Sequence, residues 1–161
     1  MPHLSTQPRA VRRGAPLACL ALVACLTSCS TESQLPPLEG GDATACARVV
    51  AALPDALMGS RRTESTDRSV TYEDVEVTCG VSTPEDYRPT AECHEVGGVG
   101  WYVPAKSLND LDEDLLAVAL SHEPYVQLTA PARQRLQGTD AALRDLAVVI
   151  TAELGEGLPC L

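Results

Sequence analysis

The sequence predicts an α+β domain: a small antiparallel sheet with two helices packed on one of its faces, stapled by disulfides. Apolar residues recur with helical spacing after residue 43 and again after residue 139. The segments between these stretches include alternating and β-branched runs that are typical of strands. Four cysteines are spread over the same region, and an even number in an exported chain indicates disulfides.

The first 28 residues are interpreted as a signal peptide. A basic segment precedes an apolar run from Ala15 to Leu26, which is shorter than the roughly 20 residues that span a bilayer. The run ends in Leu26-Thr27-Ser28-Cys29, which resembles the lipobox of bacterial lipoproteins: an aliphatic residue, two small residues and the cysteine that is acylated. We therefore expect residues 1–28 to be removed and Cys29 to hold the protein on the extracytoplasmic face of the cell membrane, with the lipid bilayer as its first partner.

Processing at that site would leave a strongly acidic chain. Three arginines leave with the signal, so the basic residues fall from 12 to 9 while all 22 acidic residues remain, a net charge near −13. That balance opposes binding to nucleic acid and to anionic lipid head groups, both of which require basic patches. The chain has no Phe and one Trp, so its core must come from Leu, Val and Ala.

The mature chain divides into a tether and one domain. Residues 29–42, with Pro36-Pro37 and Gly40-Gly41 among polar residues, are interpreted as the lipidated N-terminus and a flexible tether. Residues 43–161 have the length of a single domain. Its four cysteines are Cys46, Cys79, Cys93 and Cys160. They allow three disulfide connectivities, and none has the C-x-x-C spacing of a redox motif.

The domain begins with a predicted helix. Its apolar face consists of residues spaced as i, i+3, i+4, i+7 and i+11, namely Cys46, Val49, Val50, Leu53 and Leu57. Asp42 is the expected N-cap, and Pro54 ends or kinks the helix near Ala52. The polar stretch Gly59 to Ser69 is interpreted as a loop.

Strands are predicted in the middle of the chain. Val75 to Val81 alternates strictly between apolar and other residues, as a half-buried strand does. After a turn region from Pro84 to Pro89, Ala91 to Val96 and Val99 to Pro104 flank Gly97-Gly98, which indicates a hairpin. Tyr125 to Thr129 is a further strand, closed by Pro131.

Two segments complete the prediction. Leu111 to Leu120 is ambiguous, because its Leu and Ala content favours a helix whereas its place before Tyr125 suits a hairpin. The last helix is capped by Thr139 and ended by Gly155. Its expected apolar face consists of Leu143, Leu146, Ala147, Ile150 and Leu154.

A series of short motifs resembles the actinobacterial lipoproteins of the domain of unknown function 3515. In order, they are Ala45-Cys46; Leu53-Pro54 with Gly59 and Arg61-Arg62; Cys79-Gly80-Val81 with Pro84; Gly98-Val99-Gly100-Trp101; Tyr125-Val126-Gln127-Leu128-Thr129 before Pro131; and a final helix ending in Leu158-Pro159. The chain departs from the family at Thr71-Tyr72-Glu73-Asp74, where a Trp-Gly pair is usual, and at His122-Glu123, where an arginine is common.

The resemblance has two consequences for structure. It implies that the segment from Leu115 to Ser121 is extended, which favours a strand in the ambiguous region. It also supports the pairing Cys46–Cys79, since both cysteines lie in shared motifs and both face the layer between helix and sheet. Cys93 and Cys160 are extra cysteines, which we expect to pair with each other. The family has no established activity, so the resemblance assigns no functional residue.

The remaining candidate sites favour ordinary structural roles. Glu92-Cys93-His94-Glu95 would alternate on a strand and offer at most two metal ligands on one face. The acidic residues Asp110, Asp112, Glu113 and Asp114 lack the glycine and the final glutamate of an EF-hand. There is no G-x-S-x-G motif. We therefore expect no metal, cofactor or catalytic residue.

The aromatic pair Trp101-Tyr102 is the remaining candidate for binding. Strand alternation places Trp101 with the valines of the core face, so it should be buried and structural, and any aromatic recognition falls to Tyr102. The sequence thus predicts a non-catalytic binding module of the cell envelope, with an envelope protein, a cell-wall component or a small ligand as its partner. The alternative is an enzyme that acts on envelope material.

Overall fold

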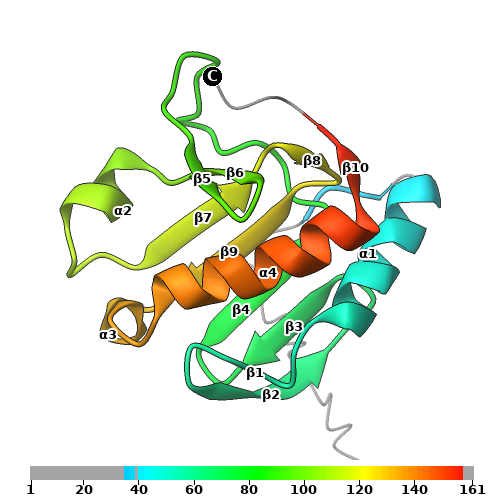
Figure 1. Cartoon of the computed structure of the whole chain (residues 1–161), viewed down its shortest axis with the longest axis horizontal. Coiled ribbons are helices and arrows are strands. Elements are labelled where there is room, and N and C mark those ends of the chain that lie inside the picture. Colours follow the sequence, from blue (N-terminus) through cyan, green and yellow to red (C-terminus); the bar gives the residue numbers. More distant parts are fainter. Residues whose placement is uncertain (1–34, 39, 158–161) are drawn as a thin grey trace, which may run out of the picture. The chain divides into compact units, whose positions relative to one another are not determined.

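An antiparallel sheet with the strand order β1-β2-β3-β4-β9-β7-β6-β5 forms the frame of the computed structural model (Figure 1). Residues 35–38 and 40–157 are described, and they belong to the unit Ser33–Leu161. The eight strands are β1 (Ala56–Leu57), β2 (Ser60–Ser65), β3 (Ser69–Tyr72), β4 (Val75–Cys79), β5 (His94–Val96), β6 (Val99–Tyr102), β7 (Leu115–Ala119) and β9 (Val126–Ala130). The short strands β8 (His122–Glu123) and β10 (Gly155–Glu156) pair separately.

Two long helices lie on one face of this sheet (Figure 1). They are α1 (Gly40–Ala52) and α4 (Thr139–Glu153). Most residues of their predicted apolar faces are buried, with Cys46, Val49 and Leu146 fully inaccessible to solvent. Two predicted members lie outside the helices: Leu57 is buried but belongs to β1, because α1 ends at Ala52, and Leu154 follows the end of α4 and is half-buried. The helices and the inward side chains of the sheet form one core, which confirms the predicted α+β arrangement.

The starts of both long helices differ from the prediction. α1 begins at Gly40, so Asp42 lies in its first turn rather than at the N-cap, and residues 40–42 belong to the helix instead of a flexible tether. A carboxylate in the first turn still stabilises the helix by interacting with its dipole. α4 is capped by Gly138 in the left-handed conformation, while the Thr139 hydroxyl donates a hydrogen bond to the Arg135 carbonyl at 2.8 Å.

The stretch predicted as a loop from Gly59 to Ser69 instead contains β2 and the start of β3. These strands lie towards one edge of the sheet, and β2 exposes most of its side chains to solvent. An exposed strand has no apolar face to bury, so its sequence shows no alternation. Its backbone is nevertheless paired, because β2 bonds to β3 and β3 bonds to β4.

The ambiguous segment after Leu111 contains the strand β7, as the family resemblance implied. β7 pairs along its whole length with β9, and Ala117, Val118 and Ala119 are fully buried. The Gly97-Gly98 hairpin is also confirmed, since both glycines have positive φ values, 63° and 81°, as a type I′ turn requires. Its first strand is shorter than predicted, beginning at His94 and not at Ala91.

Two short helices were not predicted from the sequence: α2 (Ala105–Asn109) and α3 (Ala132–Arg135). Each follows a proline, Pro104 or Pro131, whose fixed φ suits the start of a helix. They flank the entry to β7 and the exit from β9, at one end of the sheet (Figure 1). This end carries the candidate site described below.

A second, smaller apolar cluster lies on the face of the sheet opposite α1 and α4. The loop between β4 and β5 folds over this face, and its Tyr87 packs edge-on against Tyr102 with ring centroids 5.2 Å apart. Val81, Val118 and Leu120 are the other buried members of the cluster. Thus the loop covers the β6 side of this face and leaves the β3 and β4 side half open.

Candidate functional site

The half-open face of the sheet carries a row of side chains that crosses four strands. Strand register places Thr71 opposite Glu76, Glu76 opposite Thr129, and Thr129 opposite Leu116. The three polar residues and Leu116 are half-buried or exposed. The row therefore gives this face a polar centre with an apolar border.

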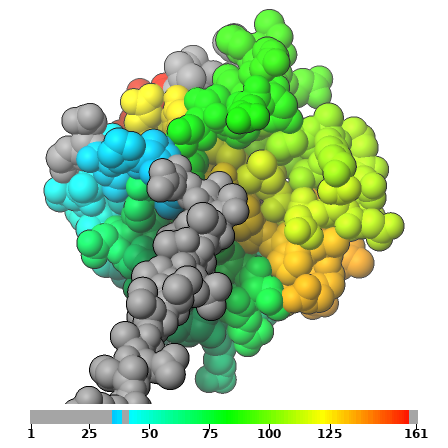
Figure 2. All heavy atoms as spheres, turned by 180° about the vertical axis from the view of Figure 1, so that it is seen from behind, coloured from blue at the N-terminus to red at the C-terminus, as the bar shows by residue number. Residues whose placement is uncertain are grey.

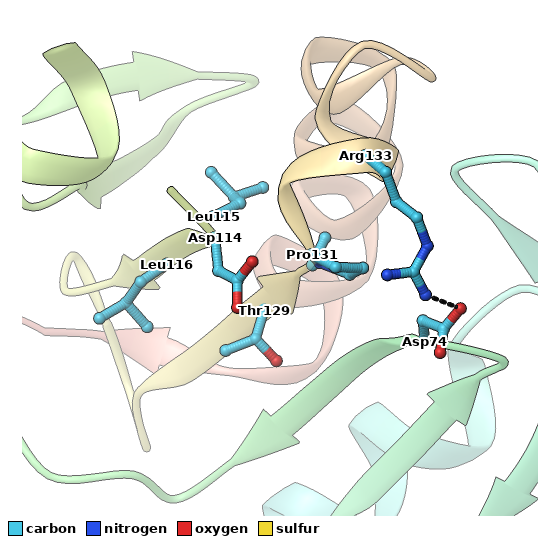
Figure 3. A pocket seen from close by; sticks show the side chains of 8 residues that line it. Asp74, Asp114, Leu115, Leu116, Thr129, Pro131 and Arg133 are labelled. Atoms are coloured by element: carbon cyan, nitrogen blue, oxygen red, sulfur yellow. Dashed lines mark hydrogen bonds and ion pairs between the residues drawn. The ribbon is translucent and has the colours of Figure 1, made fainter. Parts of the chain in front are cut away.

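A groove of about 380 Å³ opens where this row reaches the end of β4, β7 and β9 (Figure 3). It is lined by Asp74, Asp114, Leu115, Leu116, Thr129, Ala130, Pro131 and Arg133. Arg133 from α3 and Asp74 from the β3–β4 turn form an ion pair across the rim. The Asp114 carboxylate accepts a hydrogen bond from the Ala132 N–H at 3.0 Å, which ties the β7 entry to the start of α3.

The groove offers ion pairing and hydrogen bonding to a ligand. Arg133 and Asp74 are 65% and 52% exposed, and surface ion pairs of this kind contribute only about 0–1 kcal/mol. A ligand carboxylate or phosphate could therefore replace Asp74 beside the guanidinium at little cost. Asp114 and Thr129 add an acceptor and a hydroxyl. Sequence reasoning named Asp114 only as part of the acidic run, and Asp74 and Thr129 only within the stretches compared with the family. It did not name Arg133, and it did not group these residues into a site, because only tertiary structure brings them together.

The opposite end of the same strands holds the segment Leu35–Leu38. The Arg68 guanidinium donates to the Pro36 carbonyl at 2.8 Å and to the Cys79 carbonyl at 3.1 Å, and it also bonds the Gly80 carbonyl. Leu38 packs against the main core. This segment was expected to be a flexible tether, and Arg68 instead fastens it to the end of β4. The segment from Pro36 to Leu38 also lines a second groove, of about 220 Å³, together with Gly80 and Tyr125.

The aromatic candidates are both buried. Trp101 is completely inaccessible to solvent in the core between sheet and helices, which confirms its predicted structural position. Tyr102 points to the other face, as predicted, but it is only 6% exposed because the β4–β5 loop covers it. Burial, and secondarily Asp86, raises the pKa of the Tyr102 hydroxyl. Recognition by Tyr102 would require that loop to move.

The predicted disulfide Cys46–Cys79 is present and joins α1 to the end of β4. Cys93 is also disulfide-bonded. Cys160 lies outside the described residues, as does the predicted lipidation site Cys29, so the pairing Cys93–Cys160 stays a prediction.

The remaining candidates are dispersed. Glu92 and His94 are exposed, and within residues 35–38 and 40–157 no three His, Cys, Asp or Glu side chains are placed to hold a metal ion.

His122 is 9% exposed, and burial lowers its pKa, with Glu156 acting in the opposite direction. Its Nδ1 lies 2.9 Å from Ser121 Oγ, which accepts a hydrogen bond from the Gly100 N–H at 2.7 Å. The bond from Gly100 therefore links β6 to the residue that precedes β8.

Comparison with known proteins identifies the class. A family model described as protein of unknown function, DUF3515, matches residues 16–158, so the chain belongs to this family. The match confirms the domain family that the sequence motifs indicated. Comparisons with curated proteins and with solved structures give no match. In the part of the chain that the structure describes, no helix has the length and apolar character needed to cross a membrane.

Proposed function

We propose that this chain is an extracytoplasmic lipoprotein, anchored to the cell membrane by lipid on Cys29, that acts as a non-catalytic binding module of the cell envelope. The observation that carries the proposal is Leu26-Thr27-Ser28-Cys29 at the end of an apolar run preceded by basic residues. More than one acyl chain on this cysteine would give stable anchoring, since each buried CH2 contributes about 0.8 kcal/mol.

Two features of the folded domain support this proposal. The Cys46–Cys79 disulfide suits an oxidising compartment outside the cytoplasm. The groove beside Arg133 provides a guanidinium, carboxylates and a hydroxyl on an accessible surface, which are groups that recognise polar ligands.

Replacement of Cys29 tests the anchoring. Cells expressing the parent protein or Cys29→Ala would be labelled with a fatty-acid analogue, and the protein would be recovered and its mass measured. We expect the parent to carry lipid and begin at residue 29, and Cys29→Ala to accumulate as an unlabelled precursor that retains the signal. Cys25→Ala is the matched control, because it removes a cysteine four residues earlier and should mature normally. Identical unlabelled mature forms from parent and Cys29→Ala would refute the proposal.

A further inference from the structure

Three exposed leucines lie in neighbouring segments of the chain, at the end of the sheet that holds the groove. Leu108 in α2, Leu111 in the following loop and Leu136 after α3 are 45%, 62% and 82% exposed. Seen from behind the long helices, α2 and its loop (yellow-green) adjoin α3 (orange) in Figure 2, and Figure 1 places them at the same end of the sheet. We call Leu108, Leu111 and Leu136 the leucine platform.

Arg135 holds the leucine platform together. Its Nη1 donates to the Asp110 carbonyl at 2.6 Å and to the Glu113 carbonyl at 3.0 Å, and its Nη2 bonds the Ser107 carbonyl. Leu108 follows Ser107, Leu111 follows Asp110, and Leu136 follows Arg135 itself. Since the backbone on both sides of the platform is fixed by one guanidinium, a partner would meet a preordered surface and lose little conformational entropy on binding.

The border of the leucine platform is acidic. Lys106 is paired with Glu113 at 2.6 Å, Arg133 is paired with Asp74, and Arg135 is occupied by carbonyls. Among the described residues, no ion pair reaches Asp110, Asp112 or Asp114, which follow one another around the loop. Apolar side chains near carboxylates that form no ion pair complement a surface that combines apolar and basic groups.

The leucine platform also lies far from the point where the chain leaves towards Cys29. β4 and β9 run between the two ends, with Gly80 and Tyr125 at the end fastened to Pro36 and with Asp74 and Pro131 at the platform end. Five strand residues span about 17 Å. Six residue steps separate Cys29 from Leu35, so this linker reaches at most about 21 Å when fully extended. Bringing the platform to the bilayer would use most of that reach.

We propose that the leucine platform is the docking surface for an envelope protein that presents a basic amphipathic segment. The direction in which the platform faces rests on the proposed lipid anchor, whereas the apolar and acidic character of the platform does not. A bilayer with anionic head groups would repel the acidic border. A second copy of this chain would bring two identical acidic loops together, which opposes self-association.

Site-specific cross-linking in intact cells tests the proposal. A photoreactive amino acid replaces Leu111 in the full-length chain, and the cross-linked peptide of the partner is sequenced by mass spectrometry. Val148 on α4 is the matched control position, because it is an apolar residue of similar exposure, 70%, away from the platform. We expect a discrete adduct from position 111 whose partner peptide is amphipathic and basic, and none of the same mass from position 148.

Second-site variants connect the adduct to the platform. Leu136→Asp should lower the adduct yield from position 111 by about tenfold or more, as expected when a central apolar contact is lost. Asp112→Lys should lower it by reversing a charge that the partner complements. An adduct with a second copy, with lipid, or with a neutral or acidic peptide would overturn the proposal, as would no adduct. Fractionation of the same cells reports the anchor separately, so a soluble protein that still forms the adduct would refute only the lipid anchor.

Discussion

Leu38 lies directly over Gly80, so closely that a Cβ on Gly80 would stand 2.1 Å from Leu38 Cδ2. The same added carbon would be 3.1 Å from Arg68 Nη2, the group that bonds the Gly80 carbonyl. Gly80 also has a φ of 74°, which residues with a side chain rarely adopt. The family motif Cys79-Gly80-Val81 therefore has a physical reason: this glycine lets the N-terminal segment pack against the end of β4.

Gly80→Ala should release this segment and destabilise the domain. The left-handed backbone conformation alone costs about 1–2 kcal/mol. The displaced Leu38 and Arg68 contacts should add about 1–3 kcal/mol. Urea unfolding followed by circular dichroism measures the total, and protease cleavage near Leu35–Leu38 should become faster.

Gly98→Ala is the matched control for Gly80→Ala. Gly98 has a similar φ of 81°, but nothing lies within 4 Å of an added Cβ. Gly98→Ala should therefore lose only the stability that the left-handed backbone conformation costs, and protease cleavage near Leu38 should keep its parent rate. If the two variants lose equal stability, the contact between Leu38 and Gly80 contributes nothing measurable.

Trp101→Ala should destabilise the domain by about 3–5 kcal/mol, because it empties a large, fully buried site. As Trp101 is the only tryptophan, its emission reports this site alone and should lie well to the blue of free tryptophan in water. Emission at the free-tryptophan wavelength with efficient quenching by iodide would contradict its burial.

Tyr102→Ala should also be clearly destabilising. Strand alternation alone places Tyr102 on the face opposite Trp101, but the structure covers this ring with Tyr87 and leaves it 6% exposed. Truncating a buried aromatic side chain typically costs a few kcal/mol. Tyr87→Ala is the companion variant: it should raise the exposure of Tyr102 while removing less buried area, since Tyr87 is itself only half-buried. Chemical modification of tyrosine at position 102 should become faster in that variant.

Helices and strands were predicted correctly from the sequence where the segment buries one of its faces. Cys46, Val49 and Val50 and the face around Leu146 repeat with helical spacing because that spacing places their side chains in one core. Leu53 and Leu57 fit the same spacing, yet they reach the core from beyond the end of α1, so a periodic pattern alone extended this helix too far. β2 was missed because its exposed polar side chains satisfy no apolar pattern. Asp42 and Thr139 were assigned as N-caps from residue type alone. In the structure α1 begins earlier, at Gly40, and the N-cap of α4 is Gly138.

The candidate site was less predictable than the fold. Arg133 and Asp74 are 59 residues apart and meet because β4 and β9 are neighbours in the sheet. Likewise, Arg135 bonds carbonyls of residues 22 to 28 positions earlier, and carbonyl groups carry no signal in a sequence. Both contacts depend on the strand order, which hydrophobic periodicity does not determine.

Loss of the Cys46–Cys79 disulfide should lower the free energy of unfolding by roughly 2–4 kcal/mol. The bridge closes a loop with a sequence separation of 33 and so restricts the unfolded chain. The double variant Cys46→Ala/Cys79→Ala, compared with the parent by urea unfolding, measures this without leaving a free thiol. Peptide mapping without reductant should recover Cys46 joined to Cys79 and Cys93 joined to Cys160. A peptide that joins Cys93 to any other cysteine would contradict the second pairing.

Acidification should destabilise the domain through His122. Burial lowers the pKa of this imidazole in the folded state, with Glu156 opposing the shift, whereas the unfolded chain has the ordinary value of about 6.5. The unfolded state therefore binds more protons as the pH falls through 6.5, and stability decreases until the pH passes the lower pKa of the folded state. One linked proton contributes at most about 1.4 kcal/mol per pH unit. Urea unfolding between about pH 7.5 and 5.5, above the ordinary carboxylate range, should show this loss. His122→Gln should flatten the dependence. An unchanged slope in His122→Gln would show that another group carries the proton linkage.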